Sequence, residues 1–385
     1  MDFDLSDEHK MLRDMVFDFA SGEIGPLAEK IDREDKFPDN IFKRLGDLGI
    51  LGVTIPEKYG GAGSDLLSAV MVLEQLAYTC PALALSYGAH SNLCANNISK
   101  NGTEEQKKKY LPPLCSGEKV GALALTEPQA GSDATNIQTT AKRMGDEYIL
   151  NGTKTFITNG PIADIVVLYA KTDKSRGAKG ISAFIIEKEF PGFSSSKAIE
   201  KMGHRGSPTG ELILEDCRVP KEDLLGEENK GIAVMMSGLD VERAFFCGEP
   251  VGIAQAALDL SLKYSKERVQ FGQPISNFQL IQEKLANMYT QIEAARLLAY
   301  KSAIVAEGSQ RGGKGTEVHK LAAAALLFSS EVAMKVTLEA VQIHGGYGYT
   351  LEYPVNRLLR DAKLIEIGAG TSEIRRLIIA RELLK

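Results

Sequence analysis

Hydrophobic residues recur at helical spacing in the first part of the chain. In residues 11–19 and again in residues 66–76, apolar side chains return every three or four positions, which places them on one face of an α-helix. Proline and glycine interrupt this spacing, most densely in residues 56–63. We therefore expect four or five helices between residues 4 and 109.

The spacing changes between residues 121 and 220, where short runs rich in Val, Ile, Tyr and Phe stand between turn residues. These runs cover residues 148–150, 165–169, 181–186 and 211–214, and such runs are typical of β-strands. Asn151-Gly152 follows the first run, and Asn-Gly is typical of two-residue hairpin turns, which need positive φ at both central positions. The pattern predicts a small all-β domain with a hairpin at Asn151-Gly152.

Helical spacing returns at about residue 231 and continues to the end of the chain. The periodic segments cover residues 231–265, 277–307 and 316–344, and a final helix follows Thr371. This order predicts an α+β fold with an N-terminal helical domain (residues 1–120), a middle β-domain (121–228) and a C-terminal helical bundle (229–385).

Charge and composition exclude several classes of function. Among 385 residues there are 45 Lys and Arg against 51 Asp and Glu, with a net charge of −6 and no long basic block, so nucleic acid is not an expected partner. Apolar runs such as residues 321–328 are shorter than the ~20 residues that cross a bilayer, so no membrane span is expected. The N-terminal residues resemble neither a signal peptide nor an Arg-rich presequence, which predicts a cytoplasmic protein, or a mitochondrial matrix protein only if this is a processed mature chain.

Several common motifs are absent from the sequence. GxGxxG after a strand, GxxxxGK[ST] and GxSxG do not occur, which excludes the commonest dinucleotide, P-loop and hydrolase sites. The cysteines and histidines lack CxxC and HExxH spacing, so no metal site is expected. Residues 123–133 leave a predicted strand into a polar loop, which taken alone is best explained as an ordinary turn.

Five blocks of residues, taken in order, resemble one known family. They are Thr126-Glu127-Pro128-x-Ala130-Gly131-Ser132-Asp133, residues 151–160, Arg268-x-x-Phe271-Gly272, residues 342–349 and Arg360-Asp361-Ala362-Lys363. In this order they resemble the acyl-CoA dehydrogenases over essentially the whole chain. The resemblance implies that family's fold, a helical domain, a β-domain and a C-terminal four-helix bundle. It also implies a homotetramer that holds FAD noncovalently between the β-domain, the bundle and a neighbouring subunit.

The resemblance also implies which residues contact FAD. The Thr158 hydroxyl lies near flavin N5, and Phe156 stands where the family often has Trp, a residue that this chain lacks. Glycine at positions 345 and 346 lets backbone approach a phosphate closely, and Thr371 opens a helix whose N-terminal amides favour an anion. The implied residues are Leu123, Leu125, Thr126, Gly131, Ser132, Phe156, Ile157 and Thr158 around the isoalloxazine, Arg268, Phe271, Gln279, Gln342, Gly345 and Gly346 at the ADP half, partly across subunits, and Thr371 and Glu373 at the pyrophosphate end.

One position departs from most of the family. The usual catalytic Glu, preceded by Tyr, is replaced here by Ala369 preceded by Gly368. Alanine cannot accept a proton, although its backbone N–H can still donate to the thioester oxygen. The run Asp240-x-Glu242-Arg243, together with residues 368–373 and 85–94, resembles the isovaleryl-CoA dehydrogenase subgroup, in which the Glu of this run is the base.

The resemblance to this subgroup assigns the acyl-CoA contacts. Such a charged triplet on a helix is more often a solvated face, but here the resemblance implies that Glu242 is the base, with a pKa raised by burial. Asp240 and Arg243 either lie along CoA or form a structural ion pair at i, i+3. The implied substrate residues are Ser132, Asp240, Arg243, Ala369 and Gly370.

The resulting hypothesis is α,β-dehydrogenation of a short branched acyl-CoA such as isovaleryl-CoA to the trans-2-enoyl-CoA. Glu242 removes the α-proton, flavin N5 takes the β-hydride, and an electron-transfer flavoprotein accepts the electrons. The alternatives are a butyryl-, 2-methylbutyryl- or cyclohexanecarbonyl-CoA substrate, an oxidase that uses O₂, and a non-redox CoA-thioester lyase or binder. Glu249 lies one to two turns past Glu242 and would narrow the pocket, bind a polar or cyclic substrate, or face solvent.

Overall fold

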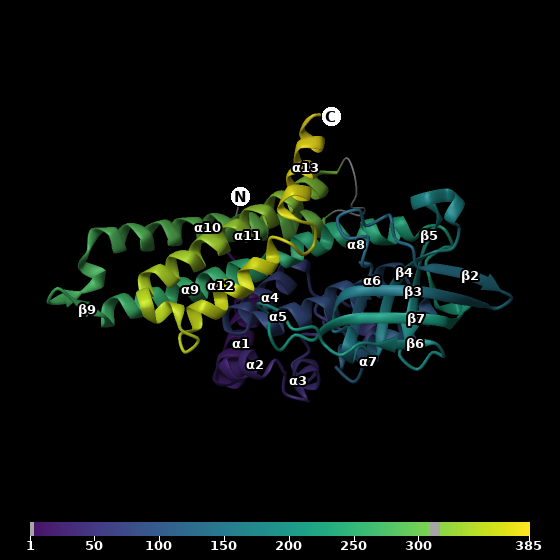
Figure 1. The fold of residues 1–385 in the computed structure, drawn as a ribbon, viewed down its shortest axis with the longest axis horizontal. Helices are drawn as coiled ribbons and strands as arrows, with labels where there is room; N and C mark the ends of the chain where they lie inside the picture. The colour runs from purple at the N-terminus through teal and green to yellow at the C-terminus, as the bar shows by residue number, and fades with distance from the viewer. Residues whose placement is uncertain (1–3, 309–315) are drawn as a thin grey trace.

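In the computed structural model, which describes residues 4–308 and 316–385, helices from both ends of the chain lie together and the β-sheet lies at one end (Figure 1). The N-terminal helices are α1 (Asp7–Phe19), α2 (Ala28–Glu34), α3 (Ile41–Asp47), α4 (Leu66–Thr79), α5 (Pro81–Gly88), α6 (Asn97–Asn101) and α7 (Glu104–Cys115), with the π-helical segment η4 (Ala89–Asn96) between α5 and α6. The expected number of four or five was wrong, because α2, α3 and α6 are too short for their periodicity to show.

The β-domain is an 8-stranded sheet with the order β6-β7-β3-β2-β4-β5-β8, and β1 pairs with β4. Its strands are β1 (Gly121–Ala124), β2 (Thr140–Met144), β3 (Glu147–Thr158), β4 (Ile165–Lys171), β5 (Ile181–Glu187), β6 (Phe193–Ser195), β7 (Thr209–Pro220) and β8 (Leu224–Leu225). Both faces are buried: Ile165, Val167 and Tyr169 of β4 pack with residues of α6, α7 and α8, and Val166 and Leu168 pack with the inward side chains of β3 and β7.

The predicted hairpin at Asn151-Gly152 was wrong. Strand β3 runs through both residues, and its pairing with β7 shifts register between Leu150 and Gly152. Glycine is needed at 152 because a Cβ there would clash with Thr139, the residue just before β2. The turn lies between β2 and β3 instead, where Gly145 has φ 65° and Met144 pairs with Glu147.

The C-terminal part is a helical bundle. Its helices are α8 (Gly231–Phe246), α9 (Gly248–Glu267), α10 (Gln279–Glu307), α11 (Glu317–His344), α12 (Pro354–Ile365) and α13 (Ser372–Leu383), with the short hairpin β9 (Val269–Gln270) and β10 (Gln273–Pro274) after α9. The segment 231–265, expected as one periodic unit, is two helices that meet at Cys247. Pro250 explains the break, because it cannot donate to the carbonyl of Phe246 and its ring crowds that carbonyl.

Helices from both ends of the chain share one hydrophobic core. Helix α4 is buried on nearly all sides and packs on α9. Gly248 and Gly252 of α9 allow the backbones of the two helices to approach closely. Glu74 of α4 accepts hydrogen bonds from Arg296 (3.0 Å) and Tyr300 (2.9 Å) of α10. The structure thus has the expected α+β fold, while the domain boundaries at 120/121 and 228/229 stay predictions.

Helix α11 has the length and hydropathy of a membrane span, although none was expected from the sequence. With the turn that follows it, the segment Glu317–Tyr349 is long and apolar enough to cross a bilayer by length and hydropathy. Here it is the central helix of the bundle, in contact with α8, α9, α10, α12 and α13, and 61% of its most apolar window is buried. Packing inside the protein explains its composition.

Candidate active site

Glu242 lies on α8 and is buried. Burial raises the pKa of Glu242 to about 7, and the positive charges of Arg243 and Arg375 oppose this rise. The phenol of Tyr169, from β4 of the sheet, also lies within electrostatic reach, because the charge of Glu242 adds to the burial that raises the pKa of Tyr169. A carboxyl group with a pKa near neutral pH is suited to proton abstraction.

Asp240 and Arg243, on the same helix, form the ion pair that the sequence left open. Asp240 Oδ1 accepts a hydrogen bond from Arg243 Nη1 at 3.0 Å and lies 2.7 Å from Nδ1 of His319 on α11. All three side chains are buried. Arg243 also points its Nε toward the carbonyl of Ala369, at 3.4 Å, so the charged end of α8 reaches the loop between α12 and α13.

The loop between α12 and α13 has an unusual backbone. Ala369 has φ 52° and Gly370 has φ 92°, a left-handed region that alanine rarely adopts. Thr371 caps α13 by accepting from the N–H of Ile374 at 3.3 Å. A Cβ at Gly370 would lie 3.9 Å from Arg243 Nη2, which places this loop directly against α8.

In the β-domain, the predicted isoalloxazine residues lie on two neighbouring segments. The N–H of Thr155 donates to the carbonyl of Thr126 at 2.9 Å, which joins the loop at 123–132 to the end of β3. Phe156 has φ 58° and stands where the pairing of β3 with β7 shifts register between Lys154 and Ile157. Such bulges redirect side chains, and Phe156 is 67% exposed.

A buried ion pair supports the loop at 123–132. Lys154 Nζ donates to Glu127 Oε1 at 2.8 Å and to the carbonyl of Leu125 at 3.1 Å. Glu127 also accepts from the backbone N–H groups of Gln138 and Thr139. Both members of the pair belong to blocks that carried the family resemblance, but the sequence assigned them no role.

The residues predicted for the ADP half of the cofactor lie at the other end of the bundle (Figure 1), whereas Thr371 and Glu373, predicted for the pyrophosphate end, lie at the start of α13. Arg268 ends α9, Gln279 begins α10, and Phe271 forms the tip of the β9–β10 hairpin, where it is 93% exposed with φ 52°. The guanidinium of Arg268 lies over the ring of Tyr347 at 5.5 Å. Helix α9 spans 20 residues, about 30 Å at 1.5 Å per residue, so one chain does not bring these residues to Glu242 or to Phe156.

At two predicted cofactor positions, Gly131 and Gly346, nothing within the chain requires the residue to be glycine. A Cβ at Gly131 or at Gly346 would meet no atom within 4 Å, and neither residue has positive φ. Glycine there fits a group from outside the chain that approaches the backbone closely. The exposed aromatic ring of Phe156 offers an apolar surface for such a group, so these residues fit a bound dinucleotide with an aromatic ring system.

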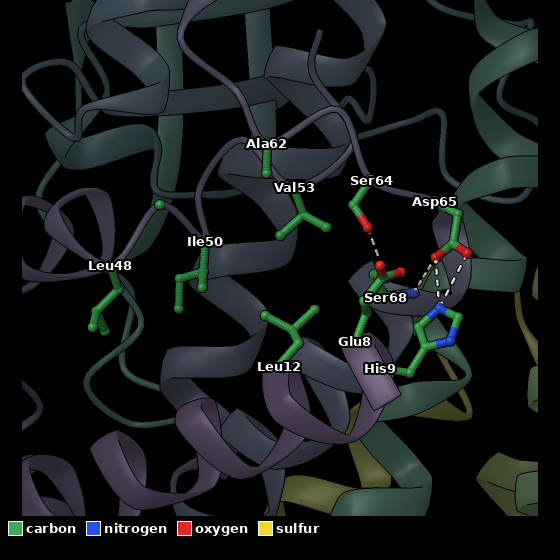
Figure 2. Close-up of a pocket in the computed structure, with 11 residues that line it drawn as sticks. Glu8, His9, Leu12, Leu48, Ile50, Val53, Ala62, Ser64, Asp65 and Ser68 are labelled. Carbon is green, nitrogen blue, oxygen red and sulfur yellow. Dashed lines mark hydrogen bonds and ion pairs between the residues drawn. The ribbon is translucent and has the colours of Figure 1, made fainter. Parts of the chain in front are cut away.

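Figure 2 shows a cavity of about 300 Å³ that lies apart from these residues. It is lined by residues of α1, α4 and the chain between α3 and α4, with His9 paired to Asp65 at 3.1 Å. None of the residues singled out from the sequence lines it. The cavity is a packing space between the N-terminal helices. Among residues 4–308 and 316–385, no cluster of three or more His, Cys, Asp or Glu side chains is arranged to hold a metal ion.

Glu249 does not face solvent, one of the roles that the sequence left open. It is fully buried in the first turn of α9 and lies 2.6 Å from Nε2 of His204, also fully buried. The N–H of His204 donates to Asp361 of α12 at 2.5 Å. Arg360 and Asp361, neighbours in the last of the five blocks, do not pair with each other: Arg360 pairs with Asp32 of α2 at 2.6 Å.

Arg375 is the residue near the candidate base that the sequence did not single out. It lies on α13, is fully buried, and donates to the backbone of the loop that carries Ala369. In the sequence it is one of two adjacent arginines, Arg375 and Arg376. Its neighbours at helical spacing are Thr371 and Ser372 on one side and Ile378 and Ile379 on the other, so the sequence offers no clear signal for a buried cation.

Comparisons with known proteins agree with these observations. Three family models match: "Acyl-CoA dehydrogenase, N-terminal domain" over residues 6–118, "middle domain" over 122–217 and "C-terminal domain" over 229–384. The mitochondrial isovaleryl-CoA dehydrogenase of Pongo abelii is 49% identical over 381 residues, covering 98% of this chain and 89% of that protein. The short-chain-specific acyl-CoA dehydrogenase of Clostridium acetobutylicum is 46% identical over 385 residues, covering 100% of both.

Solved structures match equally well. The butyryl-CoA dehydrogenase of Megasphaera elsdenii has a TM-score of 0.96 at 45% identity, covering 100% of both chains. A structure described as the electron transferring flavoprotein of Acidaminococcus fermentans contains a chain with a TM-score of 0.96 at 46% identity, again over 100% of both chains.

Proposed function

Because the chain belongs to the acyl-CoA dehydrogenase family, we propose that it dehydrogenates a short branched-chain acyl-CoA, with Glu242 as the base. The family and its solved relatives imply FAD as the cofactor. The observation that supports Glu242 is its place: a buried carboxyl group with a pKa of about 7 lies on α8 next to the loop in which Ala369 stands where most of the family has its Glu.

Two groups of the chain act in the proposed proton transfer: the carboxylate of Glu242 and the backbone N–H of Ala369. Glu242 takes the α-proton, which is weakly acidic and needs a base within hydrogen-bond reach. The N–H of Ala369 donates to the thioester oxygen and stabilises the negative charge that develops there. FAD, when bound, supplies the acceptor for the β-hydride. Thr158 and Phe156 lie at the end of β3, on the face proposed for the isoalloxazine.

A branched substrate is favoured by the small side chain at position 369, because the methyl group of alanine leaves room beside Cα and Cβ of the acyl chain. The relatives include both isovaleryl and short-chain-specific enzymes, so a straight butyryl chain is the second candidate. The 2-methylbutyryl and cyclohexanecarbonyl thioesters remain proposals of the same chemistry.

The ligand contacts are proposed as follows. Ser132, Asp240, Arg243, Ala369 and Gly370 contact the acyl-CoA, with Asp240 and Arg243 acting as an ion pair that also faces CoA. The outer residues, from Arg268 to the glycines at 345–346, meet the ADP half of FAD bound mainly to a neighbouring copy. An electron-transfer flavoprotein accepts the electrons, and the cytoplasm is the proposed location.

A homotetramer is proposed because the bundle exposes apolar side chains. Leu297 and Ile304 of α10 are 50% and 59% exposed and Leu338 of α11 is 52% exposed. Leu297 and Ile304 are two helical turns apart and so share one face of α10. A second copy seated on α10 and α11 would cover them and would bring a second Arg268 and Phe271 within range of the site.

The test is an anaerobic titration of the purified flavoprotein with isovaleryl-, butyryl-, 2-methylbutyryl- and cyclohexanecarbonyl-CoA. We expect isovaleryl-CoA to bleach the oxidised flavin band most rapidly and the product to be the enoyl-CoA. Bleaching only by butyryl-CoA would assign the straight-chain substrate. A yellow protein that none of them bleaches would support the non-redox alternative, and peroxide release without an acceptor protein would support the oxidase.

A further inference from the structure

Arg375 combines complete burial with backbone hydrogen bonds. Its guanidinium donates to the carbonyls of Ile365 at 2.7 Å and Gly368 at 2.6 Å, and to the hydroxyl of Ser330 on α11 at 3.1 Å. All three acceptors are neutral. Burying a cation is costly, so a shorter apolar residue at this position would be the expected choice if packing were its only role.

The bond to Gly368 has a direct geometric consequence. The carbonyl of Gly368 and the N–H of Ala369 belong to one planar peptide unit, and in a trans peptide they point in opposite directions. No cis peptide occurs among residues 4–308 and 316–385. Fixing the carbonyl therefore fixes the direction of the N–H on the other side of the unit.

The next peptide is held as well. Arg243 Nε lies 3.4 Å from the carbonyl of Ala369, so arginines from α13 and α8 hold both peptides that flank this residue. The left-handed backbone of Ala369, φ 52°, is strained for a residue with a side chain and persists only when its surroundings impose it. The two arginines supply that constraint.

Arg375 also lies within electrostatic reach of the candidate base. The charges that act on Glu242 are Arg243 from its own helix and Arg375 from α13, and Glu242 in turn acts on Tyr169 from β4. Arg375 is the positive charge among them that comes from a separate element, and it lowers the pKa of Glu242 against the effect of burial.

We infer that Arg375 is a positioning residue for the dehydrogenation: it holds the Gly368–Ala369 peptide with its N–H toward the thioester oxygen and keeps a positive charge beside Glu242. This inference rests on the proposed roles of Glu242 and Ala369. Because both actions come from one guanidinium, they can be separated by substitutions that keep or remove the charge.

The test compares Arg375→Gln, Arg375→Lys and the matched control Arg376→Gln. Arg376 is the next residue on α13 and forms an exposed ion pair with Glu331. Each holoenzyme is assayed for kcat, KM and FAD content. The assays run from about pH 6 to about pH 9, a range that covers the titration of a catalytic carboxyl group such as Glu242.

We expect Arg375→Gln to lower kcat by about tenfold or more, a part of the ~10²–10³-fold cost of losing an oxyanion donor, with a smaller change in KM. The pH midpoint of kcat should move to higher pH, because the charge that favours the carboxylate is gone. Arg375→Lys should keep the midpoint near that of the wild type while kcat stays low, and Arg376→Gln should match the wild type.

Wild-type kcat and pH midpoint in Arg375→Gln would overturn the inference. If that variant does not fold, Arg375→Lys decides: wild-type kcat overturns the inference, and a low kcat with normal FAD content and an unchanged midpoint supports it. Glu242→Gln, assayed in parallel, separates the two proposals, because an active Glu242→Gln enzyme contradicts the proposed base whatever Arg375 does.

Discussion

The two ends of the helical bundle differ in how completely one chain builds them. Near Glu242, the helix α8, the loop at 366–371 and α13 are joined by buried hydrogen bonds and charges. Around Arg268 and Phe271, the predicted cofactor residues lie on exposed turns, with Phe271 93% exposed. The inner region is enclosed by elements of one chain. In the outer region Arg268 and Phe271 contact the aromatic rings of Tyr347 and Phe278, and Phe271 stays largely exposed.

The two regions should therefore contribute to different properties of the enzyme, turnover and cofactor binding. Under the proposed function, we expect proton transfer at the inner site to depend on groups that the fold of one chain holds in place. We expect cofactor affinity to depend on contacts from a second copy. Substitutions in the two regions should therefore affect different measurements, turnover for the inner region and FAD content for the outer one.

The largest expected effect is that of Glu242→Gln. The amide cannot accept the α-proton, so turnover should fall by roughly 10³-fold or more. FAD content and thioester binding should remain, because the shape of the side chain is nearly unchanged. Steady-state kinetics and flavin absorbance measure both. The control is Glu29→Gln, an exposed carboxylate on α2, which should keep full activity; turnover within tenfold of the wild type in Glu242→Gln would break the comparison.

Leu297→Asp tests the outer region. A carboxylate on the exposed apolar face of α10 should be costly to bury against a second copy, so the assembly should dissociate and lose most of its FAD. Light scattering coupled to size exclusion, with the ratio of flavin to protein absorbance, gives both readouts. Met144→Asp is the control, since Met144 is 54% exposed on the β2–β3 hairpin. A tetramer with full FAD in Leu297→Asp would place the interface elsewhere.

The pH dependence of turnover should come from the inner region alone. Burial raises the pKa of Glu242 to about 7, and only the carboxylate accepts a proton, so kcat should fall as the pH drops through this value. Well below the midpoint the decrease approaches about tenfold per pH unit. FAD content should stay constant across the same range. A flat kcat profile between pH 5.5 and pH 8, roughly the range in which a tuned carboxyl group titrates, would contradict this assignment.

The smallest effect is expected from Gly346→Ala. The added methyl group meets no atom of the same chain, and the residue has no positive φ, so the free energy of unfolding should change by less than about 0.5 kcal/mol. FAD affinity should fall several-fold if backbone approaches the cofactor here, as equilibrium dialysis can measure. Gly22→Ala, equally open but on the N-terminal helices, is the control; equal FAD affinity in both variants would remove Gly346 from the proposed site.

Much of the fold could be predicted from the sequence, because local periodicity reports burial directly. The four runs of β-branched and aromatic residues are strands β3, β4, β5 and β7, and β4 alternates between two buried faces. The long helices α10 and α11 lie where the apolar spacing placed them. In these elements, local pattern and tertiary packing agree.

The errors arose where one residue type serves two physical purposes. Gly152 is glycine because Thr139, the residue before β2, lies too close for a Cβ and because its φ is 152°, and a sequence does not distinguish such a glycine inside a strand from one in a turn. Pro250 ended α8 within a run whose apolar period continues through it. In both cases a contact or steric conflict decided the structure, not the period.

The sequence supplied only part of the candidate site. The base was inferred from the resemblance of Asp240-x-Glu242-Arg243 to one subgroup of the family, because residue types alone favoured a solvated helix face; the burial of Glu242 and its raised pKa come from the structure. Arg375 was missed because its role depends on the carbonyls of Ile365 and Gly368, which are main-chain atoms that any residue would provide. Hydrogen bonds from a side chain to distant backbone leave no trace in the residue types of their acceptors.

The core shared by the two ends of the chain has a consequence for biosynthesis. Helix α4 emerges from the ribosome early, but its main partner α9 follows only after the whole β-domain has been translated. Helices α1 and α5 can cover part of α4 before that, but the apolar face that packs on α9 stays uncovered and is available for aggregation or chaperone binding. Helix α4 can therefore reach its final packing only after α9 has been synthesised.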